Sequence, residues 1–204
     1  MTQGAVGPRG FPSWDELYRN DTIEKLPWFF AELDPDLAKA LDDNGVKPGA
    51  RVLDQGTGPG TQARELAKRG YVVTASDLAP AAIDYAKRHA RDAKIDFVVD
   101  DVLKTRLRGP FDAIFDRGCF HVLPPETRRA FSASMKRLLA PRGFLFLKTF
   151  SHLQPGEQGP HRFTREQIHD AFDADFDVLS IVDTIYQGQL DPMPKAFFST
   201  LRAR

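Results

Sequence analysis

The chain has 204 residues, and its 28 lysines and arginines balance 28 aspartates and glutamates, which gives a formal net charge of zero. This length suits one well-packed domain and is short for two, and neutrality gives no electrostatic reason to expect a nucleic acid or an anionic membrane as partner. A single cysteine, Cys119, excludes an internal disulfide and a cysteine metal cluster.

The N-terminal part predicts a lead-in followed by a helix and a strand. Residues 1–12 are rich in glycine and proline and are expected to be flexible, with one domain over residues 13–204. Asp34-Pro35 predicts a helix start, with a capping side chain and a proline in the first turn, and Gly45 predicts its end. A short apolar strand follows over residues 50–54.

Helices and strands then alternate along the chain. The apolar periods predict helices over 61–70, 79–93, from about 125 and over 164–172, and strands over 71–77, 95–101, 111–118 and 143–151. Two strand-like runs, 175–187 and 195–204, have no helix between them and indicate an antiparallel hairpin at a sheet edge. The sequence therefore predicts an α/β doubly wound sheet of seven strands, mostly parallel, with an antiparallel C-terminal hairpin.

A glycine loop follows the first strand. Its pattern is D-x-G-x-G-x-G, formed by Asp54, Gly56, Gly58 and Gly60. In open α/β sheets ligands bind beyond the carboxyl ends of the strands, so this loop is the first candidate site. A dinucleotide fingerprint would need a third glycine at position 61, which is threonine, and no Gly-Lys-Ser/Thr follows as a phosphate-binding P-loop requires.

This loop resembles the first motif of the class I S-adenosylmethionine-dependent methyltransferases, which have a Rossmann-like fold. The cofactor has no phosphate, and a glycine loop lets the backbone approach it closely. Asp54 could receive its ammonium group, and Asp77, about twenty residues past the glycines, suits the two ribose hydroxyls. The resemblance places an acceptor for the adenine amine at the end of the third strand, where we favour Asp101 over Asp100 because apolar Val102 follows it.

The segment from residue 111 to 151 narrows the resemblance. A D-R-G triplet follows the fourth strand, and two tryptophans, Trp14 and Trp28, precede the glycine strand. These features are similar to the thiopurine, tellurite-resistance and halide/thiol methyltransferase group, over residues 13–151. The resemblance implies that residues 13–33 close over the cofactor. The chain departs from the group at residues 119–121, which puts the substrate in doubt, and it lacks the Asn/Asp-Pro-Pro-aromatic motif of enzymes that methylate nucleic-acid bases.

The resemblance and the strand ends together give a set of candidate site residues. The cofactor site is predicted to comprise Trp28, Asp54, Gly56, Thr57, Gly58, Gly60, Asp77, Leu78, Asp101, Val102, Arg117 and Gly118, and the substrate pocket Trp14, Phe29, Cys119, Phe120 and His152. No carboxylate cluster has convincing metal spacing, so no metal is expected.

Four of the residues around the D-R-G triplet have alternative interpretations. Arg117 is expected to contact the cofactor carboxylate or the substrate, of which the resemblance favours the cofactor, and the alternative is a structural ion pair with Asp116 or Asp54. Asp116 receives the methionine end or orients Arg117. His121 is a candidate general base, with a structural buried histidine as the alternative. Cys119 is interpreted as pocket lining, because methyl passes directly from sulfonium to acceptor without a covalent enzyme intermediate.

The cost of deprotonation favours a soft acceptor. A thiol of pKa about 8.5 costs roughly 2 kcal/mol to ionise at pH 7, and a phenol near 10 costs about 4 kcal/mol. Aligning donor and acceptor contributes on the order of 7–11 kcal/mol. We therefore expect a cytoplasmic enzyme that methylates a small-molecule thiol or other soft nucleophile, without nucleic-acid or membrane partners. The alternatives are a small-molecule O- or N-methyltransferase, and a regulatory protein that binds the cofactor without turnover.

Overall fold

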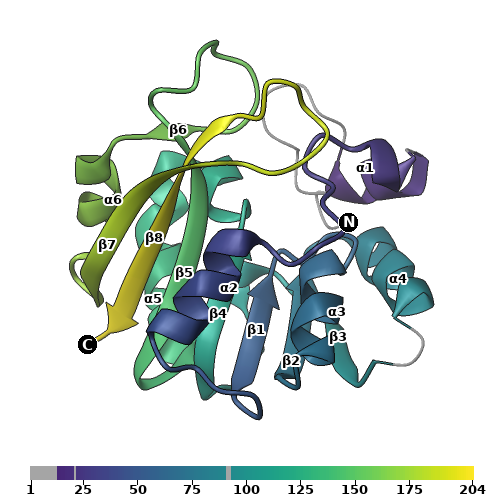
Figure 1. The fold of residues 1–204 in the computed structure, drawn as a ribbon, viewed down its shortest axis with the longest axis horizontal. Coiled ribbons are helices and arrows are strands. Elements are labelled where there is room, and N and C mark those ends of the chain that lie inside the picture. Colours follow the sequence, from purple (N-terminus) through teal and green to yellow (C-terminus); the bar gives the residue numbers. More distant parts are fainter. Residues whose placement is uncertain (1–12, 21, 91–92) are drawn as a thin grey trace.

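A twisted β-sheet runs through the centre of the protein, whose computed structural model describes residues 13–20, 22–90 and 93–204 (Figure 1). The expected flexible lead-in, residues 1–12, lies outside the described residues. The strands are β1 (Arg51–Gln55), β2 (Val72–Asp77), β3 (Ile95–Val99), β4 (Phe111–Arg117), β5 (Leu139–Ser151), β6 (Arg162–Phe163), β7 (Phe176–Ile185) and β8 (Lys195–Ala203).

The strand order is β3-β2-β1-β4-β5-β8-β7, and the two-residue β6 pairs with β5 beside this path. Strands β1 to β5 are parallel, and β8 is antiparallel to both β5 and β7. The predicted doubly wound sheet with an antiparallel C-terminal pair is confirmed, with short β6 as an addition. Strands β7 and β8 form the predicted pair at the sheet edge. β8 lies between β5 and β7, so β7 is the edge strand.

Helices cover both faces of this sheet. They are α1 (Trp14–Asn20), α2 (Pro35–Asp43), α3 (Thr61–Lys68), α4 (Pro80–His89), α5 (Arg128–Leu138) and α6 (Arg165–Phe172). The apolar sides of α2 and α3 share one core with the sheet, and those of α5 and α6 share the other. None of the described helices is long and apolar enough to cross a membrane.

Local sequence explains where the helices begin. The Asp34 side chain accepts from the Asp36 N–H at 3.0 Å ahead of Pro35, and Thr164 and Gln167 form the predicted capping box of α6. The helix expected from about 125 begins at Arg128, because residues 125–127 form a 3₁₀ turn, η5 (Pro125–Thr127).

Strand order reverses at β1, which has β2 on one side and β4 on the other. The carboxyl ends of these three strands carry the glycine loop, Asp77 and the D-R-G triplet. Because parallel strands end at the same edge, the fold brings these segments together at the switch point, where α/β sheets bind ligands.

Candidate active site

The glycine loop is held by a buried carboxylate. Asp54 accepts from the Thr57 hydroxyl at 2.5 Å and from the Ala63 N–H at 3.1 Å through the same oxygen, Oδ2. Burial raises the pKa of Asp54 to about 6, while these two hydrogen bonds oppose the rise. Asp54 thus joins the end of β1 to the first turn of α3 and fixes the loop between them.

All three glycines of this loop adopt positive φ angles, between 52° and 72°. Each also lies where a side chain would collide with a neighbour. A Cβ atom at Gly56 would lie 2.8 Å from the Cys119 Cβ, and one at Gly60 would lie 2.7 Å from the Ala86 Cβ. Only glycine satisfies both conditions, so the backbone of the loop packs directly against these neighbouring side chains.

Asp77 ties this loop to the second strand. Its Oδ2 accepts from the Gly58 N–H at 2.9 Å, and its Oδ1 accepts from the Ala79 N–H at 2.9 Å. Burial raises the pKa of Asp77, against the effect of these backbone donors. The neighbouring Leu78 is 41% exposed, so its apolar side chain lies on the open side of the loop.

The two aspartates after β3 differ in their hydrogen bonding. Asp101 caps the 3₁₀ turn η3 (Val102–Lys104) by accepting from the Leu103 N–H at 3.0 Å. Asp100 accepts from the Arg106 N–H through Oδ1, but its buried Oδ2 has no hydrogen-bond partner among the described residues. Val102 is buried below them. Both carboxylates therefore stay candidates for the adenine amine.

The N-terminal segment packs over the glycine loop. The Trp28 indole donates to the Tyr18 hydroxyl at 3.2 Å, and the rings of Trp14 and Trp28 meet edge to face. A Cβ at Gly58 would lie 2.6 Å from the Tyr18 hydroxyl, so this tyrosine lies directly over the loop. Sequence reasoning missed Tyr18, although its spacing of four residues from Trp14 places both on one face of a helix.

Helix α1 is attached to α4 by an unusual cap. Helix α4 has no capping side chain of its own, and Asp15 of α1 accepts from the Ala81 N–H at 2.8 Å. Leu17, Ala79 and Ala82 are buried in the same small core. The segment 13–33 is thereby fixed beside the Asp77 turn.

Arg117 makes contacts that the sequence did not predict. Its Nε donates to Asp34 at 2.9 Å, its Nη1 to the Trp28 carbonyl at 3.1 Å and its Nη2 to the Gln187 carbonyl at 2.5 Å. The expected structural ion pair with Asp116 or Asp54 is wrong, because the pairing carboxylate comes from Asp34 at the start of α2. Composition and spacing give no signal for a partner this distant in the chain.

A second buried cation completes this cluster. The Lys148 ammonium contacts both oxygens of Asp34, at 2.9 and 2.7 Å, and Asp36 at 2.7 Å. It also donates to Gln187 Oε1 at 2.6 Å. Lys148 and Asp34 have no exposed side-chain surface and the Asp36 side chain is 25% exposed, so two cations balance two carboxylates in a cluster that reaches the surface at Asp36.

Asp116 holds the turn after β4. Its carboxylate accepts from the N–H groups of Gly118, Cys119 and Phe120, at 3.0 to 3.3 Å. Burial raises the pKa of Asp116 to about 7 despite these donors. The side chain thus fixes the D-R-G backbone, and it does so with both of its oxygens.

His121 lies buried next to Gly118. Its Nδ1 accepts from the Phe150 N–H at 3.3 Å, so the neutral ring carries its proton on Nε2. Burial lowers its pKa to about 3, and the charge of Arg117 contributes to this shift. A Cβ at Gly118 would lie 2.9 Å from Nε2 and 2.5 Å from the Tyr186 hydroxyl, which places both groups over this glycine.

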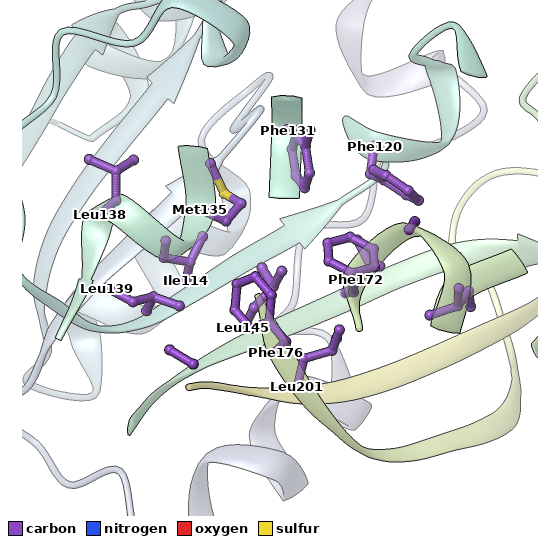
Figure 2. Packing of buried hydrophobic residues seen from close by; sticks show 14 of the residues in the cluster. Ile114, Phe120, Phe131, Met135, Leu138, Leu139, Leu145, Phe172, Phe176 and Leu201 are labelled. Atoms are coloured by element: carbon purple, nitrogen blue, oxygen red, sulfur yellow. The ribbon is translucent and has the colours of Figure 1, made fainter. Parts of the chain in front are cut away.

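The predicted substrate-pocket residues separate into different environments. Phe120 is fully buried among Phe131, Phe163 and Phe172 in the core under α5 and α6, so its assignment to a substrate pocket is wrong (Figure 2). The sequence could not distinguish it from its neighbour Cys119, which lies half-buried over Gly56.

The other three residues of that set are not buried in this core. Trp14 and Phe29 are partly buried against the small core of the N-terminal segment, whereas His152 is exposed with its ring 5.9 Å from that of Phe197. Burial, followed by the charge of Asp116, raises the pKa of the Cys119 thiol well above its usual range, so this thiol is neutral. No group of three or more metal-binding side chains occurs in the part of the chain that the structure describes.

Known proteins share this arrangement. Residues 52–143 match the model of a methyltransferase domain. A 2-heptyl-1-hydroxyquinolin-4(1H)-one methyltransferase from Mycobacteroides abscessus is 29% identical over 77% of this chain and 73% of its own length. An uncharacterised methyltransferase from Schizosaccharomyces pombe is 31% identical over 59% of this chain and 82% of its own length. This chain is a class I S-adenosylmethionine-dependent methyltransferase.

A solved structure extends the similarity over nearly the whole methyltransferase. It concerns the conversion of a disulfide bond into a thioacetal group during echinomycin biosynthesis, and it superimposes with a TM-score of 0.79 at 26% identity, covering 93% of this chain and 91% of the other. The cofactor of the methyltransferase is S-adenosylmethionine, and other solved methyltransferases of this fold contain it or its demethylated product.

Proposed function

We propose that this methyltransferase transfers the methyl group of S-adenosylmethionine to sulfur, or another soft nucleophile, of a small molecule. The observation that carries the proposal is that Asp116 and His121, two described titratable side chains next to Gly118, are already engaged by the protein. Asp116 accepts three backbone N–H groups, and His121 already uses Nδ1 as an acceptor and has its pKa lowered to about 3. Cys119 is a neutral thiol whose pKa is raised by burial.

An acceptor in such a site has to ionise largely by itself. A thiol loses its proton at a cost of roughly 2 kcal/mol at pH 7, which alignment with the sulfonium can offset. A phenol costs about 4 kcal/mol and has a greater need of a base, whereas Asp116 and His121 are already engaged in hydrogen bonds with the backbone. We therefore replace the general-base role expected of His121 by that of a donor, which orients the acceptor through Nε2–H.

Several groups of this chain suit the cofactor. The glycine loop has no side chains of its own at its three glycines, so a ligand can approach its backbone closely, and the Asp77 carboxylate at its edge suits the ribose hydroxyls. The unpaired Asp100 oxygen, or Asp101, suits the adenine amine. Tyr18 and Trp28 cover the loop from the N-terminal side. When bound, the cofactor supplies an electrophilic methyl group, and the protein holds it in line with the acceptor.

Two of the similar proteins favour different atoms as the acceptor of the methyl group. The solved structure at 26% identity concerns a substrate in which sulfur reacts, which favours a sulfur acceptor. The Mycobacteroides abscessus relative acts on a hydroxyquinolone, which contains oxygen and nitrogen but no sulfur. The second candidate function is therefore O-methylation of an acidic hydroxyl on a heteroaromatic ring, since an acidic hydroxyl also needs no strong base. We further propose a cytoplasmic location and no nucleic-acid partner.

A panel of acceptors tests the proposal. Labelled S-adenosylmethionine is offered with aryl and alkyl thiols, hydrogen sulfide, selenite, hydroxyquinolones, phenols and amines at equal concentration. We expect transfer to sulfur or selenium, with a rate that follows the ionisation of the acceptor. Transfer restricted to the hydroxyquinolones establishes the second candidate. Tight cofactor binding with no transfer to any acceptor contradicts both and leaves a regulatory role.

A further inference from the structure

Two segments from opposite ends of the chain meet above the D-R-G turn. One is the N-terminal segment, residues 13–20 and 22–33, which lies over the glycine loop, and the other is the β7–β8 loop, residues 186–194. Figure 1 shows this loop crossing the carboxyl edge of the sheet towards α1. The Gln189 N–H donates to the Pro27 carbonyl at 2.9 Å, and its side chain donates to the Phe29 carbonyl at 3.1 Å.

The two segments also pack closely at Gly188. A Cβ atom there would lie 2.1 Å from the Pro27 carbonyl oxygen and 3.4 Å from the Trp28 Cα. This glycine has no positive φ angle, so close packing alone excludes a side chain at this position. The contact between the segments is therefore tight backbone packing, and any added atom would separate them.

Arg117 holds both segments at once. Its two terminal nitrogens donate to the Trp28 carbonyl in one segment and the Gln187 carbonyl in the other, while Nε is anchored on Asp34. The guanidinium lies 4.6 Å from the centre of the Tyr186 ring, and the Tyr186 hydroxyl donates to the Arg117 carbonyl at 2.7 Å. A planar fork can reach three acceptors in three directions, and a lysine ammonium in this place cannot keep that geometry.

The two segments face different parts of the site. The N-terminal segment carries Tyr18 and Trp28, which cover the glycine loop. The β7–β8 loop carries Tyr186, whose ring stacks on His121 with centres 5.6 Å apart and whose hydroxyl lies over Gly118. A group fixed to both segments transmits a change in one to the other.

We propose that Arg117 is a positioning residue that couples cofactor binding under the N-terminal segment to the ordering of the β7–β8 loop on the acceptor side. The inference rests on the cofactor placement given under the proposed function. Cofactor binding then brings Tyr186 and His121 into place for the acceptor, and the two substrates bind in a favoured order. Asp34 and Lys148 supply the buried charges that hold the guanidinium in position.

Hydrogen exchange tests the coupling with S-adenosylhomocysteine as the probe. In the wild-type protein we expect the probe to slow exchange in residues 23–30 and, by about tenfold or more, in residues 186–194, since a charge-assisted hydrogen bond has at least that equilibrium weight. In Arg117→Lys we expect the probe still to slow exchange in residues 23–30 but no longer in residues 186–194. Gly188→Ala should also abolish the protection of residues 186–194, and it leaves the buried charges unaltered. If Arg117→Lys does not fold, Gly188→Ala tests the coupling by itself.

Leu190→Ala is the matched control, because this exposed residue belongs to the same loop and should keep the wild-type response. Protection of 186–194 that persists in Arg117→Lys and in Gly188→Ala overturns the inference. If the probe protects only residues 23–30 in the wild-type protein, the coupling is overturned but the proposed cofactor placement is not. Binding of the probe without protection of 23–30 overturns that placement and the coupling with it. Once an acceptor is identified, Arg117→Lys should raise its KM more than it lowers kcat.

Discussion

The proposed cofactor half and the proposed acceptor half of the site are held together over very different distances along the chain. On the cofactor side, Asp54 bonds Thr57 three residues away, and Asp77 bonds Gly58 nineteen residues away. On the acceptor side, Arg117 bonds Asp34 across 83 residues, and Lys148 bonds Asp34 across 114. The cofactor half is thus built from local turns and one strand crossing, whereas the acceptor half depends on charges that meet only in the folded protein.

This difference predicts different effects of substitutions in the two halves. Changes in the cofactor half alter the shape of one loop and should affect cofactor affinity or local packing. Changes in the buried charge cluster leave an unpaired ion in the interior, and should affect the stability of the whole protein first. Four experiments test the contrast, in order of decreasing expected effect.

Lys148→Met should have the largest effect. Removal of the ammonium leaves the fully buried Asp34 with Arg117 as its cation and takes away the ion pair of the partly exposed Asp36, which is expected to cost about 3–5 kcal/mol of unfolding free energy. Urea denaturation measures the change. Lys39→Met is the control, because its ion pair with Asp43 is exposed and should contribute about 0.5 kcal/mol or less. Equal stability of the two variants would show that the cluster does not hold the acceptor half together.

Gly60→Ala tests the packing of the cofactor half. The added Cβ would lie 2.7 Å from that of Ala86, and the residue also has a φ angle of 72°. We expect a loss of about 1–2 kcal/mol from the backbone conformation and a further 1–3 kcal/mol from overpacking. Gly45→Ala is the matched control, since it has a φ angle of 68° with no atom within 4 Å. If both variants lose the same stability in thermal or urea unfolding, close packing at Gly60 is not important.

Asp77→Asn should weaken cofactor binding by about 1–3 kcal/mol, because a charged acceptor of hydrogen bonds is replaced by a neutral one. Calorimetric titration with S-adenosylhomocysteine measures this change. Asp84→Asn on the exposed side of α4 is the control and should bind as the wild-type protein does. An unchanged affinity in Asp77→Asn would remove this carboxylate from the cofactor site.

The smallest effect is a pH dependence that comes from the acceptor half. Burial lowers the folded-state pKa of His121 to about 3, whereas the unfolded chain binds this proton near pH 6.5. Because the unfolded state then holds the His121 proton, the contribution of His121 to stability should fall by about 1–2 kcal/mol between pH 6.5 and 5, whereas the raised pKa values of Asp54 and Asp116 act in the opposite direction. His121→Asn retains the contributions of Asp54 and Asp116, so between these two pH values the wild-type protein should lose about 1–2 kcal/mol of stability relative to this variant. If the unfolding free energies of the two proteins change by the same amount between pH 6.5 and 5, His121 is not a buried neutral histidine.

The sequence predicted most of the fold because the fold repeats a local pattern. Each strand carries its own apolar run, and the helix starts at Asp34 and Thr164 carry their own capping side chains. Strand β5 begins earlier than expected, at Leu139, since pairing with Phe111 across a bulge extends it beyond its apolar run. Such extensions depend on the partner strand, which the local sequence does not encode.

The candidate site was predicted less evenly. The glycine loop and Asp77 lie together at the strand ends because parallel strands share an edge, so their convergence followed from the alternation alone. Tyr18 was missed. Phe120 was placed in the wrong environment because adjacent residues after β4 point in different directions: Cys119 lies over the glycine loop, whereas Phe120 is buried in the core. The cofactor roles of these residues stay predictions until binding is measured.

By itself the sequence determined the strand and helix alternation, the glycine loop, the acidic strand ends and the resemblance to class I methyltransferases, because each of these is carried by residues near one another in the chain. Only the tertiary structure decided the partner of Arg117, the burial of Lys148 and the meeting of the N-terminal segment with the β7–β8 loop. The physical reason is that a buried charge takes its partner from whichever segment packs against it, and that packing is set by the whole sheet.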